Sequence, residues 1–160
     1  MLMSLSRRLA FCGLALVAGC RLEDHTPEGS RRDEAQIREV IVEYYRAFAR
    51  MDGAACRKFF ARDGVVSRPS AVGDSTADVT ITPADSFFLN ITRISKGLGE
   101  VRGEVHVLRV DLKQVDGVAS VWATVRMDFP PHVVEQVEHL VLHRTSEGWR
   151  IILLSFTPSG

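Results

Sequence analysis

Alternating apolar and polar residues fill the last third of the chain, and this pattern constrains the fold most. Between residues 121 and 129 every odd position is apolar, which is the period of a β-strand with one buried face. Residues 105–114 alternate in the same way, and residues 133–144 and 149–156 form a predicted hairpin around the turn 145–148. We therefore expect an antiparallel meander.

Helical patterns precede these strands. Apolar residues recur at spacings of three and four after Asp33, which predicts a helix that Asp33 caps and that stops at Gly53. A second short helix is predicted to stop at Gly64, and a third starts at Thr82-Pro83. Helices grouped before an antiparallel sheet predict an α+β fold, with three N-terminal helices packed on one sheet face.

The first twenty residues predict export. A basic start precedes the apolar run 9–17, which is too short to span a bilayer, and the small residues 17–19 lead to Cys20. This ending resembles the lipobox of bacterial lipoproteins, which implies that Cys20 is acylated and becomes the first mature residue. The alternative is an ordinary signal peptide in which Cys20 lies at the cleavage site by chance.

The predicted organisation is a lipoprotein signal peptide at 1–19, a lipidated tether at 20–33 and one domain at 34–157. A lipid on Cys20 would hold the domain at the bacterial cell envelope, with the membrane as its partner. An aspartate directly after the lipidated cysteine would resemble an inner-membrane retention signal, but this chain has Arg21 at that position. In a host with two membranes, this favours the periplasmic side of the outer membrane.

Composition excludes several classes of function. The full chain has 20 basic and 20 acidic residues, and removal of the signal peptide leaves 18 and 20, a formal charge of −2. The sequence has no basic patch of the kind that would indicate nucleic acid as a partner. We find no glycine-rich phosphate loop, nucleophile motif or metal-ligand cluster, so we expect no metal and no cofactor. Cys56 has no partner in a mature lipoprotein and is predicted to be buried.

Three segments together carry a family resemblance. The first helix contains Tyr44-Tyr45, the segment Phe59-Phe60-Ala61-Arg62-Asp63-Gly64-Val65-Val66 follows, and the chain closes on Glu147-Gly148-Trp149-Arg150-Ile151-Ile152. Residues 34–157 thereby resemble the nuclear-transport-factor-2-like superfamily of SnoaL-like and ketosteroid-isomerase-like domains. The resemblance implies a curved, cystatin-like sheet wrapped on helices into a cone with a pocket, often in a dimer. The superfamily includes isomerases, dehydratases, cyclases and non-catalytic proteins, so it names no activity.

Steroid-isomerase chemistry is not expected. In that branch a pocket tyrosine on the first helix matches Tyr44. Its general-base aspartate precedes a proline, and here Arg68 precedes Pro69. Arginine stays protonated and cannot act as a base. The protonated acid of that branch lies near Val141 on the penultimate strand, and no acid stands at that position.

The predicted hairpin defines a candidate pocket face. If Arg144 pairs with Trp149, then His139 and His143 share a face with Arg150, and the resemblance implies that this face lines the pocket. A slip of one residue would exchange the two faces. The predicted pocket residues are Tyr44, His139, Val141, Ile152, Leu154 and Phe156.

Acid–base candidates are Tyr44, His139 and His143, each with a structural alternative in the core or at a strand end. The two histidines lie about 13 Å apart along a strand, too far to share a metal ion. His106 is in phase with Leu108 and is predicted to be a core histidine. Arg126, two residues before Asp128, forms either a surface ion pair or a carboxylate site at the cone mouth.

Two functions stay open. The favoured one is a non-catalytic, envelope-anchored domain that binds a small apolar ligand or supports another envelope protein. The alternative is a cofactor-free isomerase or lyase that uses Tyr44 with His139 or His143. The last hairpin is apolar on both faces, and only one can meet the helices, so we also expect a homodimer that pairs through the sheet.

Overall fold

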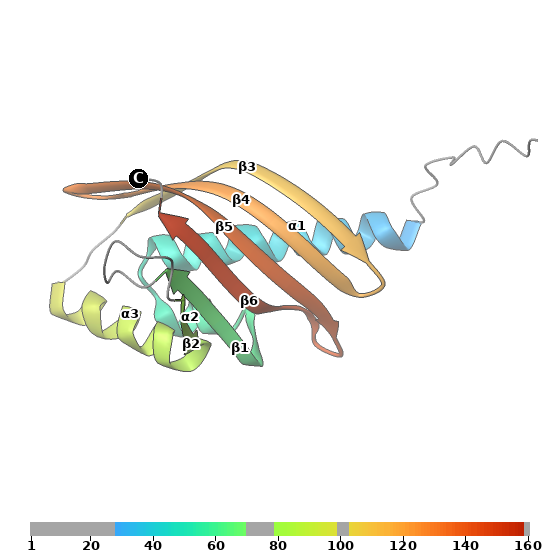
Figure 1. Cartoon of the computed structure of the whole chain (residues 1–160), viewed down its shortest axis with the longest axis horizontal. Helices are drawn as coiled ribbons and strands as arrows, with labels where there is room; N and C mark the ends of the chain where they lie inside the picture. Colours follow the sequence, from blue (N-terminus) through green and yellow to red (C-terminus); the bar gives the residue numbers. More distant parts are fainter. Residues whose placement is uncertain (1–27, 70–78, 99–102, 159–160) are drawn as a thin grey trace, which may run out of the picture.

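The computed structural model describes residues 28–69, 79–98 and 103–158 (Figure 1). The predicted signal peptide, the lipidation site Cys20 and part of the predicted tether lie outside these residues. The elements in chain order are α1 (Glu28–Ala49), α2 (Gly53–Arg57), β1 (Phe60–Pro69), β2 (Val79–Pro83), α3 (Ala84–Leu98), β3 (Glu104–Val115), β4 (Val118–Phe129), β5 (His132–Thr145) and β6 (Gly148–Pro158).

The strands form one curved, unclosed sheet in the order β2-β1-β6-β5-β4-β3 (Figure 1). All neighbours are antiparallel except β1 and β6, which are parallel. We call the face that packs on the helices the inner face and the opposite one the outer face. The predicted α+β fold and antiparallel meander are confirmed.

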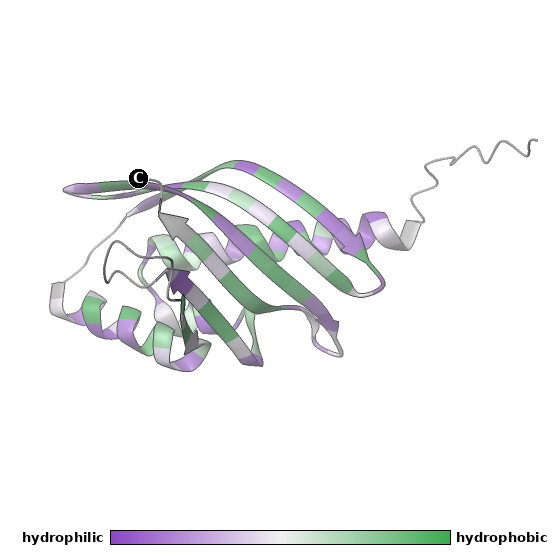
Figure 2. Ribbon diagram, viewed as in Figure 1, coloured by the Kyte–Doolittle hydropathy of each residue, from purple (hydrophilic) through white to green (hydrophobic). Residues whose placement is uncertain are grey.

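Side-chain alternation along β4 explains which face is buried. Val121 and Val125 are fully buried on the inner face, whereas Trp122 between them is 49% exposed on the outer face. Figure 2 shows the same alternation as apolar and polar bands along β3 and β4. Leu140 of β5 pairs with Val121 and is also fully buried. Burial of such side chains is worth about 1.5–3 kcal/mol each, which holds the sheet against the helices.

Helix α1 begins earlier than predicted, at Glu28, so that Asp33 lies inside the helix. The Asp33 carboxylate is nearly buried and accepts hydrogen bonds from Gln114 Nε2 at 3.2 Å and Arg144 Nη1 at 3.1 Å. It therefore does not act as the predicted helix cap. Instead it ties α1 to the far ends of β3 and β5.

Two β-bulges change the predicted phase of the strands. In β3 the pairing with β4 skips Leu108, and in β6 the pairing with β5 skips Ile152. An extra residue in one strand reverses which face the following side chains occupy. His106 therefore lies half-exposed near Glu104 and Asp128 on the outer face. The prediction of a core histidine at this position was wrong.

The core lies between the helices and the sheet. Among the described residues, every buried apolar side chain falls between Ile37 and Leu154 in the sequence, so a chain that begins at Arg21 keeps all of them. Cys56 is fully buried in the core, as predicted, and forms no disulfide with a described residue. Burial, with a smaller effect from Asp52, raises the pKa of the Cys56 thiol to about 12. Among the described residues, no helix combines the length and apolarity needed to cross a membrane.

Candidate functional site

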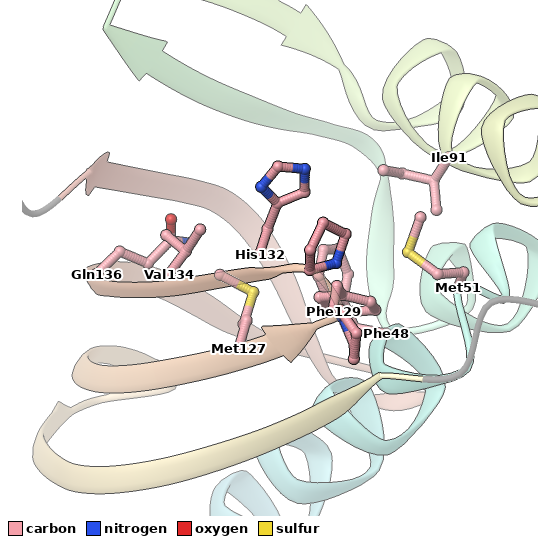
Figure 3. A pocket seen from close by; sticks show the side chains of 10 residues that line it. Phe48, Met51, Ile91, Met127, Phe129, His132, Val134 and Gln136 are labelled. Atoms are coloured by element: carbon pink, nitrogen blue, oxygen red, sulfur yellow. The ribbon is translucent and has the colours of Figure 1, made fainter. Parts of the chain in front are cut away.

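A largely apolar cavity of about 600 Å³ opens between the end of α1, the middle of α3 and the turn from β4 to β5 (Figure 3). Its walls are apolar except at His132 and Gln136. The lining residues are Phe48, Met51, Ile91, Met127, Phe129, Pro130, Pro131, His132, Val134 and Gln136.

Close backbone packing positions the aromatic wall of this cavity. The Gly103 amide donates a hydrogen bond to the Ala49 carbonyl at 3.0 Å, which joins the start of β3 to the end of α1. A Cβ atom at Gly103 would lie 2.3 Å from the Phe129 ring. The absence of a side chain there lets Phe129 pack edge-on against Phe48, with ring centroids 6.2 Å apart. Glycine is needed here for close approach and not for an unusual backbone angle.

A buried polar network continues from the cavity into the core. Gln136, which lines the cavity, donates from Nε2 to Glu138 Oε1 at 2.6 Å. From α1, the Tyr45 hydroxyl donates to Glu138 Oε2 at 2.9 Å. Glu138 is 4% exposed and does not line the cavity itself. A buried carboxyl group needs such partners, because an unpaired one loses its hydration without compensation.

The surroundings of Glu138 favour its neutral form. Burial raises the pKa of the Glu138 carboxyl, and the hydrogen bonds from Gln136 and Tyr45 offset this only in part. Burial, followed by the nearby Glu138 charge, also raises the pKa of the Tyr45 phenol. Glu138 and its partners lie one residue behind the cavity wall, and the polar side chains that line the cavity itself are Gln136 and His132.

The structure separates the predicted catalytic candidates. Tyr44 is fully buried in an aromatic cluster with Tyr45, Phe60 and Phe88, and it does not line the cavity. Burial, with smaller effects from Glu138 and Cys56, raises the pKa of its hydroxyl. The side chain thus belongs to the core.

Both histidine candidates lie on the outer face. His139 stacks on Trp122 with ring centroids 3.9 Å apart and forms a 2.7 Å hydrogen bond with Ser120. Burial lowers the pKa of the His139 imidazole. His143 is exposed near the strand end. The sheet therefore separates Tyr44 from both histidines, and no Tyr44–histidine dyad forms.

The bulge at Ile152 splits the predicted pocket face. The predicted pairing of Arg144 with Trp149 is confirmed. Before the bulge, Trp149 and Ile151 are buried on the inner face; after it, Leu154 takes the inner position opposite Leu140. Leu154 and Phe156 thus face inward as predicted, whereas Val141 lies with His139 on the outer face. None of the predicted pocket residues lines the cavity beside Gln136.

Sequence reasoning missed Gln136 and Glu138. Both residues alternate in β5 with Leu140 and Leu142, and alternate residues of a strand share a face. This spacing was the available signal that they face the core. Glu138 lies three residues before Val141 on β5, but its side chain is on the inner face whereas that of Val141 is on the outer face. Arg126 pairs with Asp128 at 3.2 Å on the outer face, so the predicted ion pair is confirmed, away from the cavity. Among the described residues, no group of three metal-ligating side chains lies together.

Comparison with solved structures identifies the architecture. Aligned with a protein of unknown function from Shewanella baltica, the chain has 16% identity and a TM-score of 0.60, covering 81% of this chain and 96% of the other. The fold is NTF2-like. A candidate scytalone dehydratase from Novosphingobium aromaticivorans aligns with 12% identity and a TM-score of 0.64, over 81% and 86% of the two chains.

A cystatin-like protein from Nostoc punctiforme aligns at 10% identity, with a TM-score of 0.62 over 80% of this chain and 92% of the other. No family model matches the sequence, and no curated protein matches it. At these identities the NTF2-like similarity describes the fold and does not carry over an activity.

Proposed function

We propose that the protein binds a small, mostly apolar molecule in the cavity beside Gln136, as a non-catalytic domain held at the cell envelope by lipid on Cys20. The cavity carries this proposal. Its volume of about 600 Å³ falls within the roughly 300–1,000 Å³ of small-molecule sites. Apolar walls with the polar side chains of Gln136 and His132 would select a ligand by shape and by one or two hydrogen bonds.

Binding is tested by filling the cavity from β5. Val134 lines the cavity, whereas its neighbour Val133 points to the outer face and is 59% exposed. In a thermal-shift screen of small apolar compounds, we expect Val134→Trp to abolish the stabilisation seen with the wild type. Val133→Trp is the matched control and should keep it. Equal responses of both variants would place the ligand elsewhere.

Envelope anchoring rests on the sequence around Cys20. The apolar run and the small residues before this cysteine support acylation, and two or three acyl chains suffice for stable attachment at about 0.8 kcal/mol per buried CH₂. We expect labelled palmitate to enter the wild type but not Cys20→Ala, and the variant to leave the membrane fraction. Equal labelling of the two proteins would contradict the anchor.

Homodimer formation through the outer face is the third part of the proposal. Val118, Trp122 and Val137 expose 40–49% of their surface on this face of β4 and β5. Apolar groups of this size on one sheet face are typical of an interface.

By light scattering at about tens of micromolar, an order suited to moderate interfaces, the chain from Arg21 should have the mass of a dimer. Trp122→Glu should reduce that mass to a monomer's. Val79→Glu, on the edge strand β2, should leave it unchanged. A monomeric wild type would reject pairing through the sheet.

A second candidate function is cofactor-free isomerase or lyase chemistry, and Glu138 is the observation that favours it. A carboxyl group whose pKa is raised by burial can donate or accept a proton during catalysis. The similarity in fold to a candidate dehydratase is compatible with this function. Because Gln136 stands between Glu138 and the cavity, a substrate would have to displace or relay through the Gln136 amide. We therefore favour binding without catalysis.

A further inference from the structure

A second cavity adjoins the first along α3. It has a volume of about 420 Å³ and lies between α3 and the strands β1 and β2. Ile91 lines both cavities, so one side chain forms their common wall. Phe87 lines the second cavity and packs on Phe156 of β6, with ring centroids 6.5 Å apart. The two cavities are therefore neighbours on the inner side of the sheet.

The second cavity is cationic, unlike the first. Arg68 from β1 and Arg93 from α3 both line it, together with the polar side chains of Thr82 and Asn90. No acidic residue is among its described lining residues. Two like charges at one small site repel each other, and an anion between them would remove that repulsion.

These two arginines also differ from others in the protein. Neither forms an ion pair with a described residue, whereas Arg109 pairs with Asp111 at 2.8 Å and Arg144 pairs with Asp33 at 3.1 Å. Both side chains are exposed, so solvent reaches their guanidinium groups. Arginine presents its N–H donors in a planar fork that matches the two oxygens of a carboxylate.

We propose that the ligand is an amphipathic carboxylate, whose charged head lies between Arg68 and Arg93 and whose apolar body extends past Ile91 into the cavity beside Gln136. This inference rests on the proposed binding function and names its ligand class. The cationic site supplies the charge recognition, and the apolar cavity supplies the area to bury the chain. A neutral molecule of the same shape would gain only the second contribution.

Titration calorimetry with decanoate and with 1-decanol tests the inference on the chain from Arg21. For the wild type, we expect decanoate to bind at least tenfold more tightly than decanol. Arg68→Gln and Arg93→Gln should each remove most of that preference while leaving the affinity for decanol unchanged. Arg109→Gln removes an arginine on the outer face of β3 and should alter neither affinity. Melting curves of the three variants, all at exposed positions, establish that each is folded.

The outcomes separate the two proposals. Equal binding of decanoate and decanol, unchanged by Arg68→Gln and Arg93→Gln, would overturn the carboxylate site and leave the proposed apolar binding function standing. If Arg109→Gln reduces the preference for decanoate as much as Arg68→Gln does, the carboxylate site is also overturned, because the effect would then come from net charge. Binding of neither compound to the wild type would count against the proposed binding function itself.

Discussion

Gly53→Ala is expected to destabilise the protein by ~3 kcal/mol or more, at the upper end of the cost of overpacking a core. A Cβ atom at Gly53 would lie 2.1 Å from the Phe88 carbonyl oxygen and 2.5 Å from Thr92 Oγ1. The first of these atoms belongs to the backbone of α3 and cannot rotate away. Relief requires α2 and α3 to separate, which would also displace Ile91 between the two cavities.

Gly97→Ala is the matched control for this substitution. Gly97 lies in α3, and a Cβ atom there would meet nothing within 4 Å. Gly97 is the penultimate residue of α3, so alanine there should stabilise the helix by no more than the roughly 0.5–1 kcal/mol gained over glycine in a helix interior. Equilibrium unfolding in urea measures both changes. A Gly53→Ala protein as stable as the wild type would show that α2 and α3 do not approach each other this closely.

Glu138→Gln is expected to make the protein more stable than the wild type at neutral pH and to remove a pH dependence. Burial raises the pKa of Glu138 in the folded protein above its ordinary value of 4.5. Below pH 4.5 the carboxyl is protonated in both states. As the pH rises, the unfolded chain loses its proton first, so the free energy of unfolding falls until the pH passes the folded pKa.

Glutamine stays neutral at every pH and can keep both partners, since the Tyr45 hydroxyl can accept as well as donate. The difference between Glu138→Gln and the wild type should therefore grow above pH 4.5, by at most ~1.4 kcal/mol per pH unit for one proton. Urea unfolding from pH 4 to pH 8 measures it. Glu135→Gln, an exposed change on the same strand, should show no comparable slope. Parallel curves for Glu138→Gln and the wild type would contradict a raised pKa.

The same variant separates the two candidate functions. If the protein only binds its ligand, Glu138→Gln should bind any compound found by screening and release it unchanged, as the wild type does. If the protein is an isomerase or lyase, mass spectrometry should detect product with the wild type but little with Glu138→Gln at undiminished binding.

Regular local patterns were predictable from the sequence. The alternation of Val121 and Trp122 along β4 and the hairpin that pairs Arg144 with Trp149 depend on periodicity and on a short turn. Each is set by neighbouring residues, because the direction of a strand side chain follows from its position along the backbone. The α+β fold, with helices in the first part of the chain and an antiparallel meander after them, followed from the same local signals.

The bulges and the buried face were decided by the tertiary structure. Leu108 and Ile152 are aliphatic residues among similar neighbours, so no local signal marks them as unpaired. Each nevertheless moves the side chains that follow it in the strand to the opposite face of the sheet. Glu138 lies in a stretch of polar residues that reads as a solvated strand. Its burial depends on which face of β5 packs against α1, from which the Tyr45 hydroxyl donates a hydrogen bond to Glu138.

The sequence by itself determined the period of each strand, the positions of the main turns and the identity of the apolar residues available for a core. Tertiary packing alone decided which polar residues the core encloses and where the cavities lie. The cavity beside Gln136 brings together α1, α3 and β5. The raised pKa of Glu138 comes from its burial in the core, where Tyr45 of α1 is a hydrogen-bond partner. Both properties arise from contacts between residues far apart in the chain, whose energies no local pattern contains.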